Sequence, residues 1–169
     1  ILDSVERCRR GRTREMAPGE FVSNGHMIWK LNDTWPSIYC GAVDYYLLPN
    51  MTYYALRLAY APVILSFEPG DRIPLWAVND SAAAISGEVR VRVYDMAEER
   101  EVEGFTQELT LPAGQSVVVS DLRRLGQGGQ LRRRYLLAAE LRDGAGTVLS
   151  RRVHLLNPER LYDFPRAVV

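Results

Sequence analysis

The pattern of apolar and polar positions changes near residue 62. Beyond that point, apolar residues alternate with polar ones in short runs separated by turn-forming residues, which is the pattern of β-strands. The clearest run is EVRVRVY at 88–94, where apolar side chains would face a core and charged ones solvent. Seven runs predict strands at 63–67, 73–79, 88–94, 105–111, 116–120, 135–141 and 147–155.

Turn signals between these runs predict how the strands connect. Asp143-Gly144-Ala145-Gly146 favours a tight hairpin between the last two strands. Seven short strands with regular turns and no cysteine bridge predict a mainly β fold, an immunoglobulin-like β-sandwich over 62–156. Residues 157–169 contain two prolines and predict a tail that packs along the surface or frays.

The first 61 residues read as α/β. Residues 3–10 are polar and compatible with a helix, and 25–31 form a short apolar run that reads as a buried strand. Residues 50–57 have helical spacing, and Pro49-Asn50 is a suitable helix start. A single buried strand needs parallel neighbours on both sides. This half is therefore expected either to dock on the sandwich or to be the end of a larger α/β body; a start at Ile1, inside a predicted helix, favours a fragment.

Composition narrows the possible partners. The 169 residues are 47% hydrophobic and carry 21 basic and 21 acidic side chains, so the net charge is zero. Neither nucleic acid nor an anionic membrane is predicted as a partner, and no apolar run reaches the length of about 18 residues that a membrane span needs.

Few residues are available for cross-links or metal binding. Two cysteines, Cys8 and Cys40, do not make a disulfide framework. With His26 and His154 as the only histidines, no metal site and no cofactor are expected. Three Asn-X-Ser/Thr tripeptides begin at residues 32, 50 and 79, a pattern that often arises by chance.

Four motifs in the first half occur together. They are MIWKLNDTWP at 27–36, VDYY at 43–46, YYALR at 53–57 and APV at 61–63. Together they resemble glycoside hydrolase family 2, most closely its β-mannosidase and exo-β-glucosaminidase branch. Departures from the family pattern flank the motifs at 38–41 and at Asn50, and they bear on subfamily and substrate preference.

The resemblance implies a domain organisation. Residues 1–61 would be the end of a (β/α)8 TIM barrel, with 27–31 in its last strand and the following helix closing it. Residues 62–156 would be the immunoglobulin-like sandwich, and 157–169 the C-terminal tail.

The resemblance also implies sugar-binding residues, because barrel active sites lie at the C-terminal ends of the strands. Trp29 would form a wall of the subsite for the terminal sugar, since an indole can stack on a sugar ring. Asn32 and Asp33 would bind sugar hydroxyl groups. The alternative is structural: Trp29 in the barrel core, with Asn32 and Asp33 capping the loop or pairing with neighbouring strands.

No catalytic residue is expected within this chain. Retaining glycosidases use two carboxylates about 5 Å apart, an acid/base and a nucleophile. In the resembled family these glutamates lie on the fourth and seventh strands, upstream of Ile1. Glu15 and Glu20 match no catalytic motif and are predicted to be solvated. The chain alone is therefore expected to be inactive; its partners would be the rest of the barrel and, through the complete enzyme, a β-linked saccharide, a mannoside first and a glucosaminide next.

Two other hypotheses stay open: a carbohydrate-binding β-sandwich and a purely structural domain. A sugar-binding sandwich usually offers a planar row of aromatic rings, whereas Trp76, Tyr94, Phe105 and Tyr135 are scattered along the chain. A barrel fragment would expose apolar surface around Ile28 and residues 53–58 and could self-associate. An autonomous module would bury that region instead.

Overall fold

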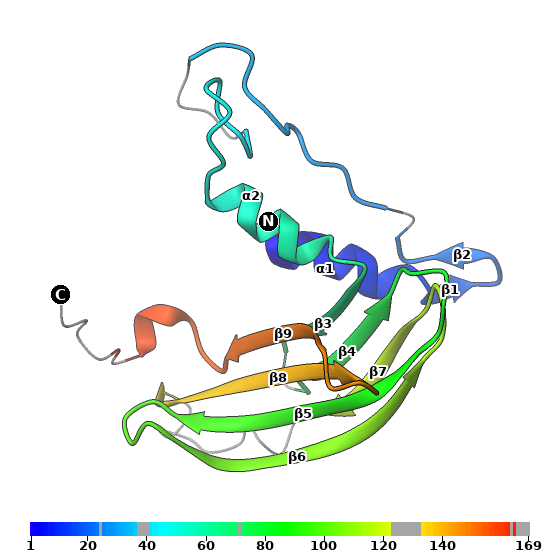
Figure 1. Ribbon diagram of the computed structural model, residues 1–169, viewed down its shortest axis with the longest axis vertical. Coiled ribbons are helices and arrows are strands. Elements are labelled where there is room, and N and C mark those ends of the chain that lie inside the picture. Colours follow the sequence, from blue (N-terminus) through cyan, green and yellow to red (C-terminus); the bar gives the residue numbers. More distant parts are fainter. Residues whose placement is uncertain (24, 37–40, 71, 123–132, 163, 165–169) are drawn as a thin grey trace.

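The main body of the molecule is two antiparallel sheets packed face to face, seen in the computed structural model (Figure 1). The structure describes residues 1–23, 25–36, 41–70, 72–122, 133–162 and 164. One sheet has the order β3-β4-β7, and the other has the order β6-β5-β8-β9. The strands are β3 (Val63–Phe67), β4 (Pro74–Asn79), β5 (Ile85–Asp95), β6 (Arg100–Leu111), β7 (Ser116–Asp121), β8 (Tyr135–Asp143) and β9 (Val148–Leu155). The seven predicted strands and the sandwich are confirmed.

The core lies between the two sheets, where alternate side chains meet. Val89, Val91 and Val93 of β5 are buried and pack in one cluster with Leu65 of β3 and Leu137 of β8. The charged residues between these valines point to the other face of the sheet, as strand geometry requires. The strict alternation seen in the sequence therefore encodes the two faces of β5.

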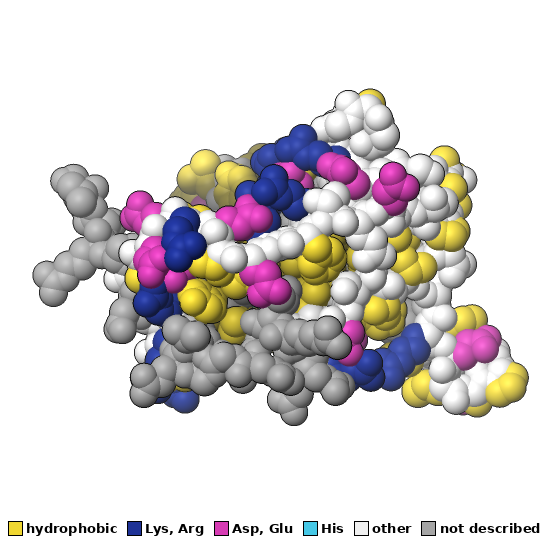
Figure 2. Space-filling model, turned by 90° about the horizontal axis from the view of Figure 1, so that it is seen from below, with side chains coloured by type: hydrophobic (Ala, Val, Ile, Leu, Met, Phe, Trp, Pro, Cys, Tyr) yellow, Lys and Arg dark blue, Asp and Glu magenta, His cyan; other side chains and the backbone are white. Residues whose placement is uncertain are grey.

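Basic and acidic side chains are mixed on the outer surface of the sandwich. In Figure 2 they lie in adjoining groups rather than in fields of one sign. Arg90 pairs with Glu101 across β5 and β6 at 2.9 Å, and Arg142 and Arg151 both pair with Glu140. Basic and acidic side chains therefore also neutralise one another locally on the four-stranded sheet.

The hairpin between β8 and β9 forms at the predicted residues. The Asp143 carboxylate accepts hydrogen bonds from the backbone N–H groups of Ala145 and Thr147 at 3.0 and 2.8 Å. Gly146 has a φ of 83°, a conformation that glycine adopts without steric cost. Local turn chemistry therefore sets this connection.

Two helices stack beside the three-stranded sheet: the first contacts β4 and β7, and the second packs on the first (Figure 1). They are α1 (Leu2–Gly11) and α2 (Met51–Ala59), and they contact each other. The Asn50 side chain accepts hydrogen bonds from the N–H groups of Thr52 and Tyr53, so α2 begins where the sequence predicts. A small hairpin of β1 (Glu15–Ala17) and β2 (Glu20–Phe21) follows α1.

Both glutamates that the sequence assigns to the surface lie on that small hairpin. Glu15 and Glu20 are exposed, as predicted.

The predicted strand at 25–31 does not form, which corrects the sequence expectation. No strand is assigned to these residues, and Met27, Trp29 and Leu31 are exposed rather than buried. The segment is extended and rises away from the sandwich (Figure 1). A strand is defined by its hydrogen-bonded neighbours, and the described residues supply none beside 25–29.

Buried charged side chains join α1 to both sheets. Arg10 donates to Ser66 Oγ on β3 at 2.5 Å, and Ser66 Oγ donates to Glu6 Oε2 at 2.8 Å. Arg152 on β9 reaches the other oxygen of Glu6 at 2.8 Å. Arg9 pairs with Asp80 at 2.9 Å in the connection after β4. The helix is therefore fixed to the sandwich by specific polar contacts as well as by packing.

The segment after β9 packs against β8 through one tyrosine. The Tyr162 hydroxyl donates to the Tyr135 carbonyl at 3.0 Å and accepts from the Leu156 N–H at 2.8 Å. It follows the short 3-10 helix η3 (Glu159–Leu161) and is buried. The tail therefore packs against β8 at Tyr162; residues 163 and 165–169 lie outside the described residues.

A carboxylate at the far end of β5 links stability to pH. Asp95 is 1% exposed and receives two hydrogen bonds from the Arg134 guanidinium. These bonds, with smaller contributions from the N–H groups of Glu98 and Ala97, hold the pKa of Asp95 below its usual value. A lowered folded-state pKa stabilises the fold above the unfolded pKa of about 3.9, and this contribution is lost as pH falls through the folded value.

We expect Asp95→Asn to lower the free energy of unfolding at pH 7 and to flatten its decline below about pH 4. Urea unfolding at pH 7, 4 and 3 measures both effects. Glu103→Gln, at an exposed position on β6, is the matched control. An Asp95→Asn profile parallel to that of the parent chain at all three pH values would show that this carboxylate does not carry the linkage.

Candidate functional site

The extended segment at 25–31 presents alternate side chains to opposite sides. Ile28 packs against the small apolar cluster formed by α1, α2 and Ala42. Met27, Trp29 and Leu31 are 95%, 84% and 63% exposed. Side chains at i and i+2 of an extended chain share a side. The helices therefore take one side of this segment, and Trp29 stands on the free side.

The start of the segment is held by a histidine. The His26 ring lies 2.9 Å from Ser4 Oγ on α1 and 3.2 Å from the Tyr60 hydroxyl after α2. The Tyr60 hydroxyl also donates to the His26 carbonyl at 3.3 Å. His26 thus bridges the two helices at the base of the segment that carries Trp29.

The end of the segment is paired with the chain that leads to α2. Val43 N–H donates to the Leu31 carbonyl at 2.8 Å, and Asp33 N–H donates to the Val43 carbonyl at 3.1 Å. Asn32 and Val43 form an isolated parallel bridge. The position of residues 30–33 is therefore set by the stretch that begins at Gly41.

The three predicted sugar-contact residues have different surroundings. Trp29 and Asn32 are exposed, and the peptide bond between Trp29 and Lys30 is cis. Asp33 is 5% exposed, and its carboxylate pairs with Lys30 Nζ at 3.0 Å. The structure brings Trp29 and Asn32 to the accessible surface and turns the Asp33 side chain into the loop.

Lys30 and Gly41 belong to this site but were not expected from the sequence. Lys30 Nζ also lies 5.8 Å from the centre of the Trp35 ring. A Cβ atom at Gly41 would lie 2.9 Å from Asp33 Oδ2, so any other residue there would require the carboxylate to shift. The family-like motif contains Lys30, but the motif alone does not indicate its partner.

Apolar exposure continues from Trp29 along the connection to α2 and along the helix itself. Tyr45 and Tyr46 are exposed with their rings edge to face at 5.2 Å, and Tyr53 and Tyr54 form a similar pair at 5.5 Å. Leu58 is exposed too. The expected exposure at 53–58 is found for Tyr53, Tyr54 and Leu58, whereas Leu56 is buried and Ile28 is partly buried in the cluster between the helices.

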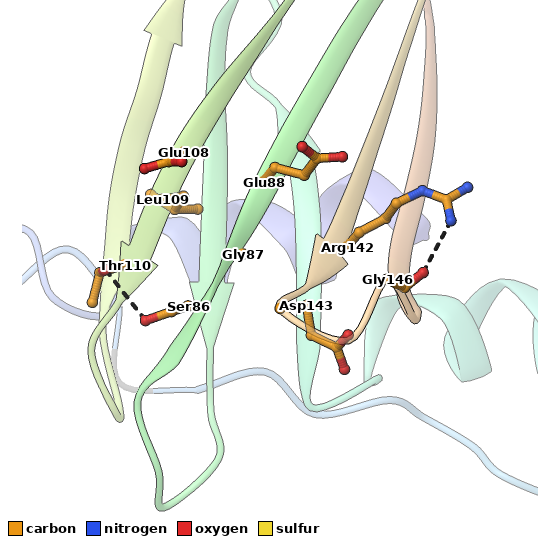
Figure 3. Close-up of a pocket in the computed structure, with 10 residues that line it drawn as sticks. Ser86, Gly87, Glu88, Glu108, Leu109, Thr110, Arg142, Asp143 and Gly146 are labelled. Atoms are coloured by element: carbon orange, nitrogen blue, oxygen red, sulfur yellow. Dashed lines mark hydrogen bonds between the residues drawn. The ribbon is translucent and has the colours of Figure 1, made fainter.

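The sandwich has an open pocket of its own, of about 540 Å³, at the end of β5, β6 and β8 (Figure 3). Glu88 and Glu108 are direct cross-strand neighbours in it, and Arg142 donates to the Gly146 carbonyl at 3.0 Å. None of its described lining residues is aromatic. The pocket thus lacks the ring platform on which a sugar-binding sandwich would rely.

The described residues offer neither a metal-ligand cluster nor a membrane-spanning helix. No three His, Cys, Asp or Glu side chains among them are grouped as ligands for a metal ion. Within the described part of the chain, no helix is long and apolar enough to cross a membrane.

Relatives of known sequence are named as mannosidases. The chain is 26% identical over 166 residues to β-mannosidase B of Thermothelomyces thermophilus, covering 83% of this chain and 19% of that protein. It is 32% identical over 92 residues to β-mannosidase B of Aspergillus niger, covering 46% of this chain and 11% of that protein. The chain thus spans a fifth or less of the length of these relatives.

Solved structures share the fold over nearly the whole chain. The β-D-mannosidase of Dictyoglomus thermophilum superposes with a TM-score of 0.76 at 20% identity, covering 97% of this chain and 19% of that one. The exo-chitosanase of Amycolatopsis orientalis also gives 0.76, at 24% identity, covering 90% and 17%. At 97% coverage, the likeness to the Dictyoglomus protein takes in the helices as well as the sandwich.

A family model described as the mannosidase Ig/CBM-like domain matches residues 71–160, which include β4 to β9. This match agrees with the β-mannosidase resemblance of the motifs at 27–63 and with the mannosidases of similar sequence. The chain therefore belongs to the mannosidase Ig/CBM-like domain family.

Proposed function

We propose that this chain is the C-terminal part of a retaining exo-β-glycosidase of the β-mannosidase type, which hydrolyses terminal β-linked sugars. Its relatives are named β-mannosidases and are at least five times longer than the matched region. In this proposal, residues 1–61 complete a catalytic (β/α)8 barrel and residues 62–156 brace it. The catalytic glutamates belong to the upstream part, so the isolated chain is inactive.

The observation that carries the proposal is the alternation at 27–31. In a (β/α)8 barrel each strand packs one side on the helix layer and turns the other toward the barrel interior. Ile28 packs against the cluster formed by α1 and α2, while Met27, Trp29 and Leu31 are exposed. A helix, an extended segment and a second helix in this order match the last units of such a barrel.

The exposed apolar side chains support the same reading. Isolated surface apolar residues are ordinary, but contiguous exposure on one side of a segment marks an interaction surface. The partner that fits is the upstream barrel, whose first and seventh strands would pair with residues 27–31 on either side. Without it, the chain is expected to self-associate through this surface.

The proposal gives Trp29 and Asn32 direct roles. Trp29, on the interior side near the end of the strand, would stack on the terminal sugar, and Asn32 would bind a hydroxyl group. A mannoside is the first candidate substrate because of the names of the relatives, and a glucosaminide is the second because of the structural neighbours.

In a polypeptide that carries this chain with the complete barrel, we expect Trp29→Ala to lower kcat/KM on nitrophenyl β-mannoside about tenfold to a hundredfold. That change corresponds to roughly 1.4–2.7 kcal/mol of lost transition-state stabilisation. Steady-state kinetics on the mannoside, glucosaminide and galactoside measure the effect and rank the sugars.

Two comparisons sharpen the test. Met27→Ala removes an apolar side chain from the same side, two residues deeper, and is expected to leave KM nearly unchanged. The chain of residues 1–169 alone should not hydrolyse any of the three substrates. Hydrolysis by that chain would place the catalytic carboxylates within it and overturn the proposal, and full activity of Trp29→Ala would return Trp29 to a core role.

A further inference from the structure

One carboxylate of the predicted sugar site is directed away from solvent. Asp33 follows Asn32 directly, yet its side chain is only 3% exposed. Its oxygens face Lys30 Nζ at 3.0 Å and the backbone of Gly41. A sugar hydroxyl could not reach this carboxylate without opening the loop.

The same carboxylate lies where three segments meet. Lys30 and Asp33 close one turn of chain immediately after Trp29. The Lys30 carbonyl accepts from Ala42 N–H at 3.2 Å, which joins that turn to the stretch after Gly41. The Asn50 side chain donates to the Gly41 carbonyl at 2.5 Å and caps α2 with its oxygen.

Charge adds to this geometry. Lys30 is the only lysine of the chain, and its side chain is about three-quarters buried. It is shared between the Asp33 carboxylate and the Trp35 ring. An ion pair with one buried partner is screened less by solvent than a surface pair, so it can fix a loop as well as stabilise it.

We infer that Asp33 is a positioning residue that acts through Lys30 and Gly41 to hold Trp29 and Asn32 in place for the sugar. This role rests on the proposed function of the complete enzyme. The Lys30–Asp33 pair sets the chain direction directly after Trp29, and Gly41 admits the carboxylate so that the pair can form beside α2.

A double-mutant cycle in the complete enzyme distinguishes a positioning role of Asp33 from direct contact with the sugar. If Asp33 acts through Lys30, Asp33→Asn and Lys30→Gln each lower kcat/KM about tenfold to a hundredfold, because a displacement near 1 Å can have such an effect. The double variant then loses no more than either single one. Lys30→Arg, which keeps the positive charge, should recover most of the activity.

Direct contact between Asp33 and the sugar would give a different set of losses. If Asp33 contacts the sugar itself, Lys30→Gln changes kcat/KM by less than threefold, while Asp33→Asn alone lowers it strongly. Additive losses in the double variant would also overturn the positioning role. Neither outcome would affect the assignment of the chain to a glycosidase, whereas absence of glycosidase activity in the parent polypeptide would sink the proposed function instead.

A measurement on the chain of residues 1–169 tests the geometry without any activity. The chain has three tryptophans, so three indole N–H signals are expected in an NMR spectrum. Asp33→Asn, Lys30→Gln and Gly41→Ala should all shift the signals of Trp29 and Trp35 and leave that of Trp76 in place. Gly25→Ala is the matched control, since a Cβ at Gly25 meets no atom within 4 Å. Unchanged Trp29 and Trp35 signals in all three variants would overturn the positioning role.

Discussion

Glu6→Ala is expected to lower the free energy of unfolding of this chain by about 3–5 kcal/mol, the usual cost of removing one partner from a buried ion pair. Glu6 is 3% exposed and accepts from Ser66 Oγ at 2.8 Å and from Arg152 at 2.8 Å. Arg10, itself 5% exposed, is bonded to the same Ser66. Without Glu6, Arg10 and Arg152 would lose the buried carboxylate that both of them contact.

The loss should be concentrated in the attachment of α1. A helix of 10 residues is marginal in isolation, so α1 depends on its contacts with the sandwich. Urea unfolding followed by circular dichroism gives the total loss, and hydrogen exchange of the α1 amides gives the local one. Glu6→Gln, which keeps the shape and one acceptor oxygen, should lose less than Glu6→Ala.

Asp3→Ala is the matched control for this prediction. Asp3 lies on the same helix and pairs with the same Arg10 at 3.6 Å, but its side chain is 65% exposed. Exposed ion pairs contribute about 0–1 kcal/mol. Equal losses for Asp3→Ala and Glu6→Ala would mean that burial of the Glu6 network contributes nothing beyond a surface pair.

The sandwich could be predicted from the sequence because its signals are local. The alternation of Val89, Val91 and Val93 indicates which face of β5 is buried. The residues from Asp143 to Gly146 indicate a hairpin, and the hydrogen bonds that stabilise it are made within that turn. The start of α2 is similar, since Asn50 caps the helix two and three residues ahead. In each case the side chains that decide the structure lie within a few positions of one another.

The segment at 25–31 could not be predicted in the same way, because a strand depends on neighbours elsewhere in the chain. Its apolar composition predicts burial between neighbouring strands, but among the described residues no strand lies beside Trp29, which is exposed. The alternation survives without the partner, because Ile28 still packs on the helices. The apolar pattern at 25–31 thus predicts which side chains would be buried, but it does not identify what would cover them.

Long-range polar contacts were also beyond sequence reasoning. Glu6 and Arg152 are separated by 146 positions, and nothing in the local pattern of α1 or β9 pairs them. Asp33 illustrates the same limit at shorter range: its place in a family-like motif suggested a sugar contact, whereas its side chain is turned toward Lys30 and Gly41. A motif can indicate that a residue belongs to a site, but it does not indicate which neighbouring side chain that residue contacts.

Asn79→Ala is expected to lower the free energy of unfolding by roughly 3 kcal/mol, because a buried amide that serves several backbone groups would be lost. Asn79 ends β4 and is 0% exposed. Its Nδ2 donates to the carbonyls of Ala83, Leu111 and Pro112 at 2.8, 3.3 and 3.2 Å. Its Oδ1 accepts from Ser81 N–H at 2.9 Å. One side chain therefore joins the connection after β4 to the turn after β6.

Ser81→Ala separates the amide's role from that of the hydroxyl it also binds. The Ser81 hydroxyl donates to Asn79 Oδ1 at 2.5 Å, and its removal leaves the three carbonyl contacts of Asn79 intact. Loss of one such bond costs about 1 kcal/mol, well below the loss expected for Asn79→Ala. Urea unfolding of the two variants at pH 7 compares them directly, and a Ser81→Ala loss as large as that of Asn79→Ala would show that the carbonyl contacts contribute nothing.

Asn79→Asp is the sharper variant, since it keeps the shape and exchanges the donor for a second acceptor. The new carboxylate oxygen would face three carbonyl oxygens in a buried site, so the loss should exceed that of Asn79→Ala. The burial of Asn79 also predicts that the Asn-X-Ser tripeptide that begins there is not glycosylated in the folded chain, because the side-chain amide is hydrogen-bonded in the core.

Mass spectrometry of the folded chain after exposure to a glycosylating system should find position 79 unmodified. A glycan at this position would mean that the amide is accessible and that its predicted contribution to stability is wrong.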